Sequence, residues 1–131
     1  MEVQKTRPIV VETDYDFFYQ WLSLVNFSFK LTESEMKFLA ALLTERHYLS
    51  KVILDPTIIT QVLFSKETKD KIVTKLELKN NQEFENRAYL LRKKGIIAEN
   101  NQINKFYIPK VDRDLKAYAM MFTIIKKDGQ G

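Results

Sequence analysis

The residues whose types could do chemistry in this chain are the amide, aromatic and basic side chains between residues 79 and 105. Asparagine and glutamine can bind adenine edges in bidentate fashion, and arginine and lysine can bind guanine or phosphate. A helix over residues 81–92 would present its amide and aromatic groups on an outer face. The residues that we predict to contact double-stranded DNA are Lys79, Asn81, Gln82, Asn86, Tyr89, Arg92, Lys93, Lys94 and Lys105.

A solvated helix face is the alternative interpretation of the same stretch. Glu83 and Glu85 lie near the start of the helix, where carboxylates suit the helix dipole but would repel phosphate groups. The lysines of the preceding segment are also typical of a solvated face, since Glu67 and Lys71 stand at i,i+4 spacing. Both interpretations therefore stay open at this stage.

Enzymatic chemistry has little support in this sequence. The chain has no cysteine, which rules out a disulfide, a thiolate zinc site and a cysteine nucleophile. The single histidine, His47, follows Arg46 near the end of a predicted helix, where a cation suits the helix dipole. Acidic pairs such as Asp14 and Asp16 stand at i,i+2 and would face apart. We expect no enzymatic activity, no cofactor and no metal.

Two capped helices joined by a short turn would position the candidate DNA-binding residues. Ser65 can cap a helix that ends near Leu76, Glu77–Lys79 forms a turn centred on Leu78, and Asn80–Glu83 offers a capped start to the next helix. Each helix has one apolar stripe, made by Ile72 and Leu76 in the first and by Phe84, Ala88 and Leu91 in the second. This order predicts a helix-turn-helix, in which the second helix reads the major groove.

A glycine and a polar turn follow the second helix. Gly95 comes after a run of cations, as is typical of a helix C-terminus. The strand formers of Ile97–Ile108, with Asn100-Asn101 as the turn, predict a β-hairpin that Pro109 ends. The order from Leu91 to Ile97, then a polar turn and a strand, resembles the junction between recognition helix and wing in bacterial and phage winged helix-turn-helix regulators. The resemblance implies a mainly α fold with a small β-hairpin.

The remaining segments extend this core within a single domain of residues 1–131. We assign residues 31–110 to the winged helix-turn-helix core. Its first helix opens with a capping box between Thr32 and Glu35. Asp55 followed by Pro56 predicts an extra short helix, because aspartate caps helices and proline suits their first position.

Residues 1–30 and 111–131 are expected to add a terminal helix on each side. Arg7–Glu12 reads as a short strand, Asp14–Asn26 as an aromatic helix, and Asp112–Lys127 as a last helix before a frayed tail. The aromatic helix carries Phe17, Phe18, Trp21, Leu22 and Val25. These apolar residues favour core packing, with a homodimer through the N-terminal or C-terminal helix as the alternative.

Composition and charge agree with a folded binding protein. Hydrophobic residues make up 45% of the chain and aromatic residues 12%, which argues against disorder. The net charge is +4. Residues 1–64 carry six basic and eight acidic side chains, whereas residues 65–110 carry eleven and six. No apolar run approaches the roughly 20 residues that cross a bilayer, so we expect a cytoplasmic protein without a membrane partner.

We interpret the chain as a sequence-specific double-stranded DNA-binding protein, a transcription regulator or replication factor of bacterial or phage origin. The alternative is a winged-helix protein interaction module in a virion, an assembly or an adaptor, with the aromatic helix and Met120–Phe122 as docking surfaces. The DNA interpretation requires the cations at Lys79, Arg92–Lys94 and Lys105 to share one face, and the alternative does not.

Overall fold

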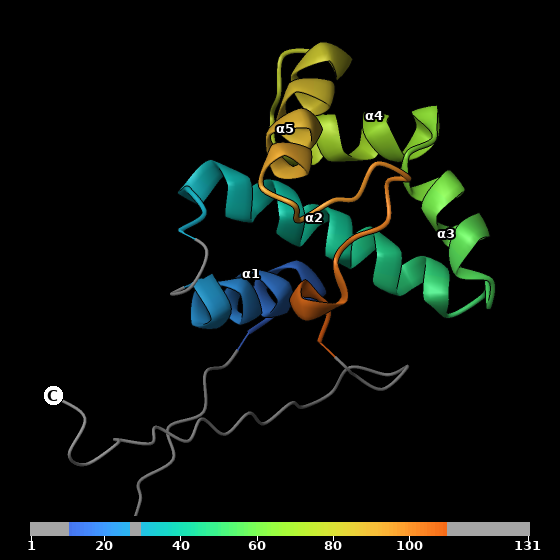
Figure 1. The fold of residues 1–131 in the computed structure, drawn as a ribbon, viewed down its shortest axis with the longest axis horizontal. Coiled ribbons are helices and arrows are strands. Elements are labelled where there is room, and N and C mark those ends of the chain that lie inside the picture. The colour runs from blue at the N-terminus through green and yellow to red at the C-terminus, as the bar shows by residue number, and fades with distance from the viewer. Residues whose placement is uncertain (1–10, 27–29, 110–131) are drawn as a thin grey trace, which may run out of the picture.

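The computed structural model of this chain describes residues 11–26 and 30–109. Its elements, in chain order, are α1 (Asp14–Val25), α2 (Glu33–Ser50), α3 (Pro56–Leu63), α4 (Lys66–Lys75), α5 (Asn81–Lys93) and the short 3-10 helix η2 (Lys105–Tyr107) (Figure 1). The predicted helix Asp112–Lys127 and most of the predicted strand Arg7–Glu12 lie outside the described residues.

The predicted helix starts are confirmed because each N-cap side chain accepts a hydrogen bond from a backbone N–H of the first turn. The N-cap residues are Thr13, Thr32, Asp55, Ser65 and Asn80. At Thr32 the capping box is complete. The Thr32 hydroxyl accepts from the Glu35 N–H (3.2 Å), and the Glu35 carboxylate accepts from the Thr32 N–H (2.8 Å). Such caps contribute about 1 kcal/mol each to helix stability.

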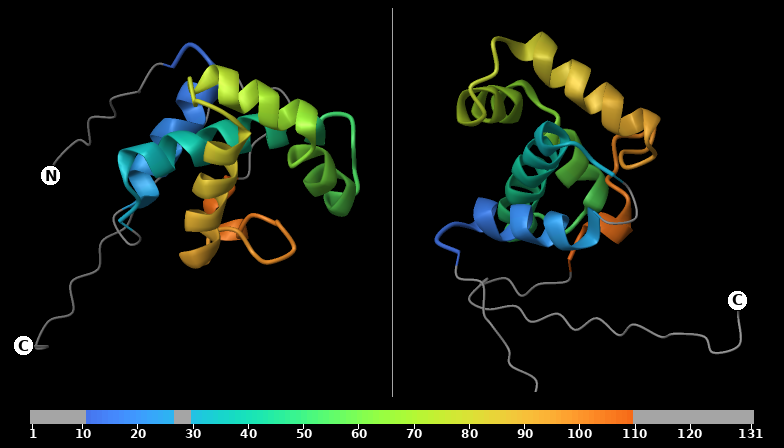
Figure 2. Two further views of the ribbon diagram at one scale, coloured as in Figure 1. Left: turned by 90° about the horizontal axis from the view of Figure 1, so that it is seen from above. Right: turned by 90° about the vertical axis from the view of Figure 1, so that its left-hand side faces the viewer.

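Helix α2 forms the centre of the fold. It lies between α1 on one side and α4 and α5 on the other, and α3 packs beside its C-terminal half (Figures 1 and 2). The residues from Phe38 to Leu43 are all at most 2% exposed, so this part of α2 is buried on every side. Phe38 meets Phe84 of α5 edge to face, with ring centroids 5.0 Å apart. In the described residues, no helix combines the length and apolar character needed to span a bilayer.

The aromatic helix α1 packs against α2. Phe18, Leu22 and Val25 are at most 5% exposed. The Trp21 indole Nε1 donates a hydrogen bond to the Tyr107 carbonyl oxygen (2.9 Å), which ties α1 to the end of the described chain. Core packing, which the sequence favoured for this helix, therefore takes up most of its apolar surface. A homodimer through α1 stays a prediction.

The predicted β-hairpin Ile97–Ile108 is wrong, and with it the winged-helix fold class. The described residues form no strand; Ile97 and Ile103 make a single isolated antiparallel bridge. A tight loop closes between them, with the Ala98 N–H donating to the Gln102 carbonyl oxygen (2.8 Å). Asn101 has φ +68°, as expected for an asparagine in a turn.

Burial of the apolar side chains explains why the hairpin does not form. Ile96 and Ile97 are adjacent, yet each is only 1% exposed. Successive side chains of a strand point to opposite faces, so a projecting wing would have exposed one of them. On the return, the Asn104 side chain accepts from the Phe106 N–H (3.0 Å), which starts η2 and brings Tyr107 into the core. The segment closes the core instead of extending from it.

Candidate nucleic-acid interface

Helices α4 and α5 form a helix-turn-helix unit. They cross steeply, as the left view of Figure 2 shows. The turn between them is closed by backbone hydrogen bonds, including one from the Leu78 N–H to the Val73 carbonyl oxygen (2.9 Å). The chain changes direction at Glu77, whose backbone has φ +55°. Leu78 is half-buried at the turn. Local contacts therefore hold α5 in a defined orientation relative to α4.

The inner face of α5 belongs to the core. Phe84, Ala88 and Leu91 stand at i, i+4 and i+7, and none of the three side chains is exposed to solvent. The Phe84 ring also contacts Phe64, with ring centroids 6.1 Å apart. The predicted apolar stripe of this helix is confirmed. Its burial decides which residues of α5 remain for a partner.

On a second face of α5, side chains point toward α4 and form an ion pair and a hydrogen bond with it. The Lys69 ammonium lies 3.2 Å from a Glu85 carboxylate oxygen, and the Asn81 amide nitrogen donates to an Asp70 carboxylate oxygen (3.2 Å). The Glu83 carboxylate, nearby, accepts from the Lys79 backbone N–H (2.6 Å). Both acidic residues that favoured the solvated-face interpretation thus have partners within this unit.

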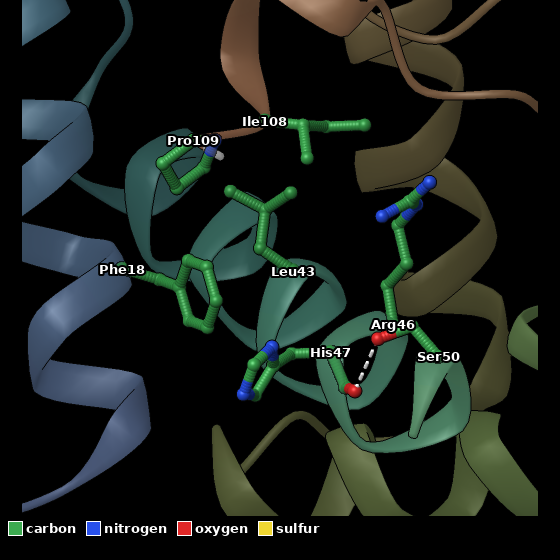
Figure 3. Close-up of a pocket in the computed structure, with 7 residues that line it drawn as sticks. All are labelled: Phe18, Leu43, Arg46, His47, Ser50, Ile108 and Pro109. Atoms are coloured by element: carbon green, nitrogen blue, oxygen red, sulfur yellow. Dashed lines mark hydrogen bonds between the residues drawn. The ribbon is translucent and has the colours of Figure 1, made fainter. Parts of the chain in front are cut away.

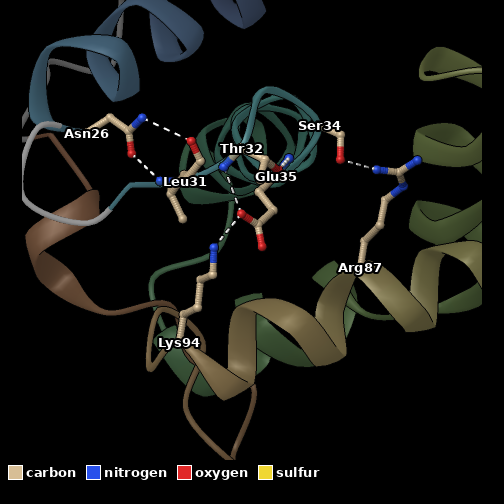
Figure 4. Close-up of polar contacts among 7 residues, drawn as sticks. All are labelled: Asn26, Leu31, Thr32, Ser34, Glu35, Arg87 and Lys94. Carbon is tan, nitrogen blue, oxygen red and sulfur yellow. Dashed lines mark hydrogen bonds and ion pairs between the residues drawn. The ribbon is translucent and has the colours of Figure 1, made fainter.

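A third face of α5 is tied to the N-terminal end of α2 (Figure 4). The Arg87 guanidinium donates to the Ser34 hydroxyl (2.7 Å). The Lys94 ammonium donates to a Glu35 carboxylate oxygen (2.6 Å), and Glu35 is only 7% exposed at its side chain. These contacts join residues more than fifty positions apart in the chain, so they orient α5 on the rest of the fold.

The outward face of α5 carries what we call the outer stripe: Gln82, Asn86, Tyr89 and Lys93. These residues stand at i, i+4, i+7 and i+11, the spacing of a single helix face. The Gln82 amide nitrogen donates to the Asn86 amide oxygen (2.9 Å), and the Lys93 ammonium lies 5.5 Å from the Tyr89 ring centroid. Tyr89 is 56% exposed. No carboxylate lies on the stripe.

The expected basic cluster Arg92–Lys94 does not form one surface. Arg92 donates through Nε and Nη2 to the Asn101 side-chain oxygen (3.1 and 2.6 Å), which fastens the loop after α5. Lys94 faces Glu35, and only Lys93 remains on the outer stripe. Three consecutive positions of a helix point about 100° apart, so a run of cations cannot share one face.

The two remaining predicted cations lie apart from each other. Lys79 is exposed in the turn before α5. Lys105 is exposed in η2, which lies beside α1, across α2 from α5 (Figure 1). In the described part of the chain, the ammonium group of neither makes a hydrogen bond or ion pair. Sequence reasoning missed the roles of Arg87 and Glu35. The sequence indicated Glu35 only as part of the capping box with Thr32, and no local pattern indicated that it pairs with Lys94.

Burial of Glu35 has electrostatic consequences. Burial alone would raise the pKa of this carboxyl group, but the hydrogen bonds from Lys94 and Thr32 outweigh it, so the pKa is lowered below 4.5. The lowered value means that the charged form is the one stabilised by folding.

We expect the Glu35 carboxylate to make stability pH-dependent in the acid range. Its contribution is fully present above pH 4.5, where the unfolded chain is also ionised, and is lost as the pH falls toward the lower folded pKa. The measurement is urea unfolding at a series of pH values for the wild type and for Glu35→Gln. The difference in unfolding free energy between the two should shrink on acidification. A constant difference across this range would contradict the expected pKa.

Within residues 11–26 and 30–109, no group of three or more histidine or acidic side chains is placed to hold a metal ion. Comparisons of the chain with protein-family models, with curated proteins and with solved structures found no match. A function for this chain therefore has to be inferred from the geometry of α4 and α5.

Proposed function

We propose that this protein binds double-stranded DNA through α4 and α5, with the outer stripe of α5 in the major groove and with Lys79 and Lys93 at the phosphates. Arg92, Lys94 and Lys105 do not share this face, so the proposal keeps only part of the cation set that the sequence predicted.

The observation that carries the proposal is the separation of charge on α5. Glu85 pairs with Lys69 of α4 and the Glu83 carboxylate accepts from the Lys79 backbone N–H in the turn, whereas the amides of Gln82 and Asn86 and the ammonium of Lys93 face outward. A groove-binding helix needs this arrangement, because carboxylates repel phosphates and amides read base edges.

The outer stripe offers chemically distinct contacts along its length. Gln82 and Asn86 can exchange their mutual hydrogen bond for bidentate bonds to adenine. Tyr89 can contact sugar or phosphate through its hydroxyl, and Lys93 and Lys79 can bind phosphates at the two ends of the helix. Phosphate contacts supply most of the affinity and base contacts supply the specificity.

The anchoring of α5 supports the proposal further. Contacts to α4 and to α2 fix the helix before any partner arrives, so little conformational entropy would be lost on binding. A rigid helix presenting polar side chains is also what sequence-specific reading requires. We place the protein among cytoplasmic regulators or replication factors of bacteria or phages. Two copies on adjacent half-sites, about 34 Å apart, would fit a dimer.

The experiment is fluorescence anisotropy with a random-sequence duplex at several salt concentrations. We expect micromolar binding that weakens steeply with salt. The double variant Lys79→Gln, Lys93→Gln should lower the slope of log affinity against log salt by about two, one for each phosphate contact. Lys37→Gln is the matched control, because it removes an exposed cation of α2 that pairs with Glu33. Its slope should stay that of the wild type.

The outcome that contradicts the proposal is the absence of binding at low salt, or equal slopes for the double variant and the wild type. That result would favour the protein interaction module instead. One observation supports this second function: Val52, Leu54 and Ile58, around the α2–α3 connection, are 80%, 88% and 45% exposed. They form a more exposed apolar surface than α1, whose aromatic residues are mostly packed.

A further inference from the structure

A pocket lies between α1, the C-terminal part of α2 and the chain just after η2, away from the outer stripe. It encloses about 250 Å³, several times the roughly 30 Å³ that one water occupies in the liquid. Phe18, Leu43 and Ile108 form its apolar walls (Figure 3). Arg46 lies on the side opposite Phe18, with His47 below. The pocket is therefore apolar on one side and basic on the other.

The Arg46 guanidinium is the first unexplained group in this pocket. The side chain is partly buried, and within the described residues it makes no ion pair or hydrogen bond. Burial lowers the pKa of Arg46, and no acidic side chain among the described residues offsets that effect. Arginine nevertheless keeps its charge in proteins. A partly desolvated guanidinium without a counter-ion is costly, and an anion would relieve that cost.

The His47 imidazole is the second unexplained group. The residue is 6% exposed, lines the pocket, and its Nε2 has no hydrogen-bond partner among the described residues. The neighbouring Ser50 hydroxyl donates to the His47 carbonyl oxygen (2.7 Å) and forms no hydrogen bond with the ring. Buried polar atoms are rarely left without a partner. A neutral imidazole has one donor and one acceptor nitrogen, so the ring can serve a polar group of a molecule that enters the pocket.

We propose that this pocket binds a small monocarboxylate with a flat apolar body. The Arg46 guanidinium would hold the carboxylate by parallel N–H···O bonds, His47 would donate to it, and the apolar body would lie between Phe18 and Ile108. A phosphate dianion fits less well. The negative end of the α2 dipole lies near the pocket and opposes two charges more strongly than one, and Arg46 is the only arginine or lysine among the described residues that line the pocket.

Benzoate is the probe for a test on the full chain without DNA. His47 is the only histidine of the protein, so its imidazole NMR signals are assigned without further work. Trp21 is the only tryptophan, and it bonds to Tyr107 next to the pocket, so its fluorescence gives a second readout. We expect benzoate to shift the His47 signals saturably, with millimolar affinity. Benzamide has the same shape without the charge and should have no such effect.

Variants test the role of the guanidinium. Arg46→Gln should weaken benzoate binding about tenfold or more, because a charge-assisted hydrogen-bond pair is lost. Arg46→Lys keeps the positive charge but loses the paired N–H groups of the guanidinium. Its benzoate affinity should lie between those of the wild type and Arg46→Gln. Lys51→Gln removes a cation one turn away that does not line the pocket, and should change the affinity by less than about twofold. Circular dichroism would verify that each variant is folded.

The proposal is overturned if the wild type gives no saturable response to benzoate, or if Arg46→Gln binds benzoate with the same affinity as the wild type. An equal response to benzamide would also overturn it, since it would show an apolar cavity without anion selectivity. DNA binding by α5 plays no part in this test. The carboxylate site and the DNA interface can therefore fail independently.

Discussion

The substitution Phe84→Ala is expected to lower the free energy of unfolding by about 3 to 5 kcal/mol. The Phe84 ring is fully buried where α5 meets α2, edge to face with Phe38 and close to Phe64. Its removal takes away apolar burial, two aromatic contacts and the packing that orients α5, and leaves a cavity. Urea unfolding followed by circular dichroism measures the change.

The control for Phe84→Ala is Leu90→Ala on the same helix. Leu90 is 46% exposed, so its truncation should change stability by less than about 0.5 kcal/mol. Both variants put alanine, the best helix former, into the same helix, so a loss of helix propensity cannot explain a loss of stability. Similar losses for both would mean that α5 is not packed on α2 as the structure has it.

The second large effect is expected for Lys94→Met, at about 1 to 3 kcal/mol of unfolding free energy. The substitution leaves the Glu35 carboxylate, 7% exposed at its side chain, without its cation. Breaking a fully buried pair costs about 3 to 5 kcal/mol. The Lys94 side chain is 38% exposed, so solvent screening reduces the cost here. Thermal or urea unfolding of the variant gives the value.

A double-mutant cycle separates this pair from general effects of the substitution. The double variant Glu35→Gln, Lys94→Met lacks the charge of both partners. Its loss of unfolding free energy should therefore be smaller than the sum of the losses in the two single variants. Lys93→Met is the matched control, because Lys93 lies one position away on the outer stripe and its loss should cost less than about 0.5 kcal/mol. A coupling energy near zero would contradict the pairing of Lys94 with Glu35.

The same variants bear on the DNA interface. Lys94→Met should leave the salt slope of DNA binding close to that of the wild type, because its ammonium is held by Glu35. Lys93→Met should lower the slope by about one. If both variants lowered the salt slope of DNA binding equally, the cations of Arg92–Lys94 would act together at the phosphates, as the sequence alone suggested.

Local signals in the sequence were enough to locate all the α-helices described. A cap such as Thr32 or Asp55 acts on backbone groups two or three residues away, so its effect is visible in a short window of sequence. The apolar stripe of α5 is likewise a matter of spacing within one helix. These features lead to the helix-turn-helix order, and to the amide residues of the outer stripe, before any tertiary contact is known.

The β-hairpin could not be judged in the same way. A strand needs a partner along its length, and the apolar side chains of residues 96–108 had a competing place in the core. Ile96 and Ile97 are both buried there, and Asn104 starts η2 on the return. Strand propensity depends strongly on such context, and here the tertiary environment favoured a loop that closes the core.

By itself, the sequence determined where the helices begin, which face of α5 is apolar, and that amide and basic groups gather on α4 and α5. Only the tertiary structure decided the partners of those groups. Lys94 pairs with a carboxylate 59 positions away, Arg92 binds the following loop, and Arg46 lines a pocket with no counter-ion among the described residues. Capping and periodicity act over a few residues, whereas pairing and burial of charge depend on which distant segments the packed core brings together.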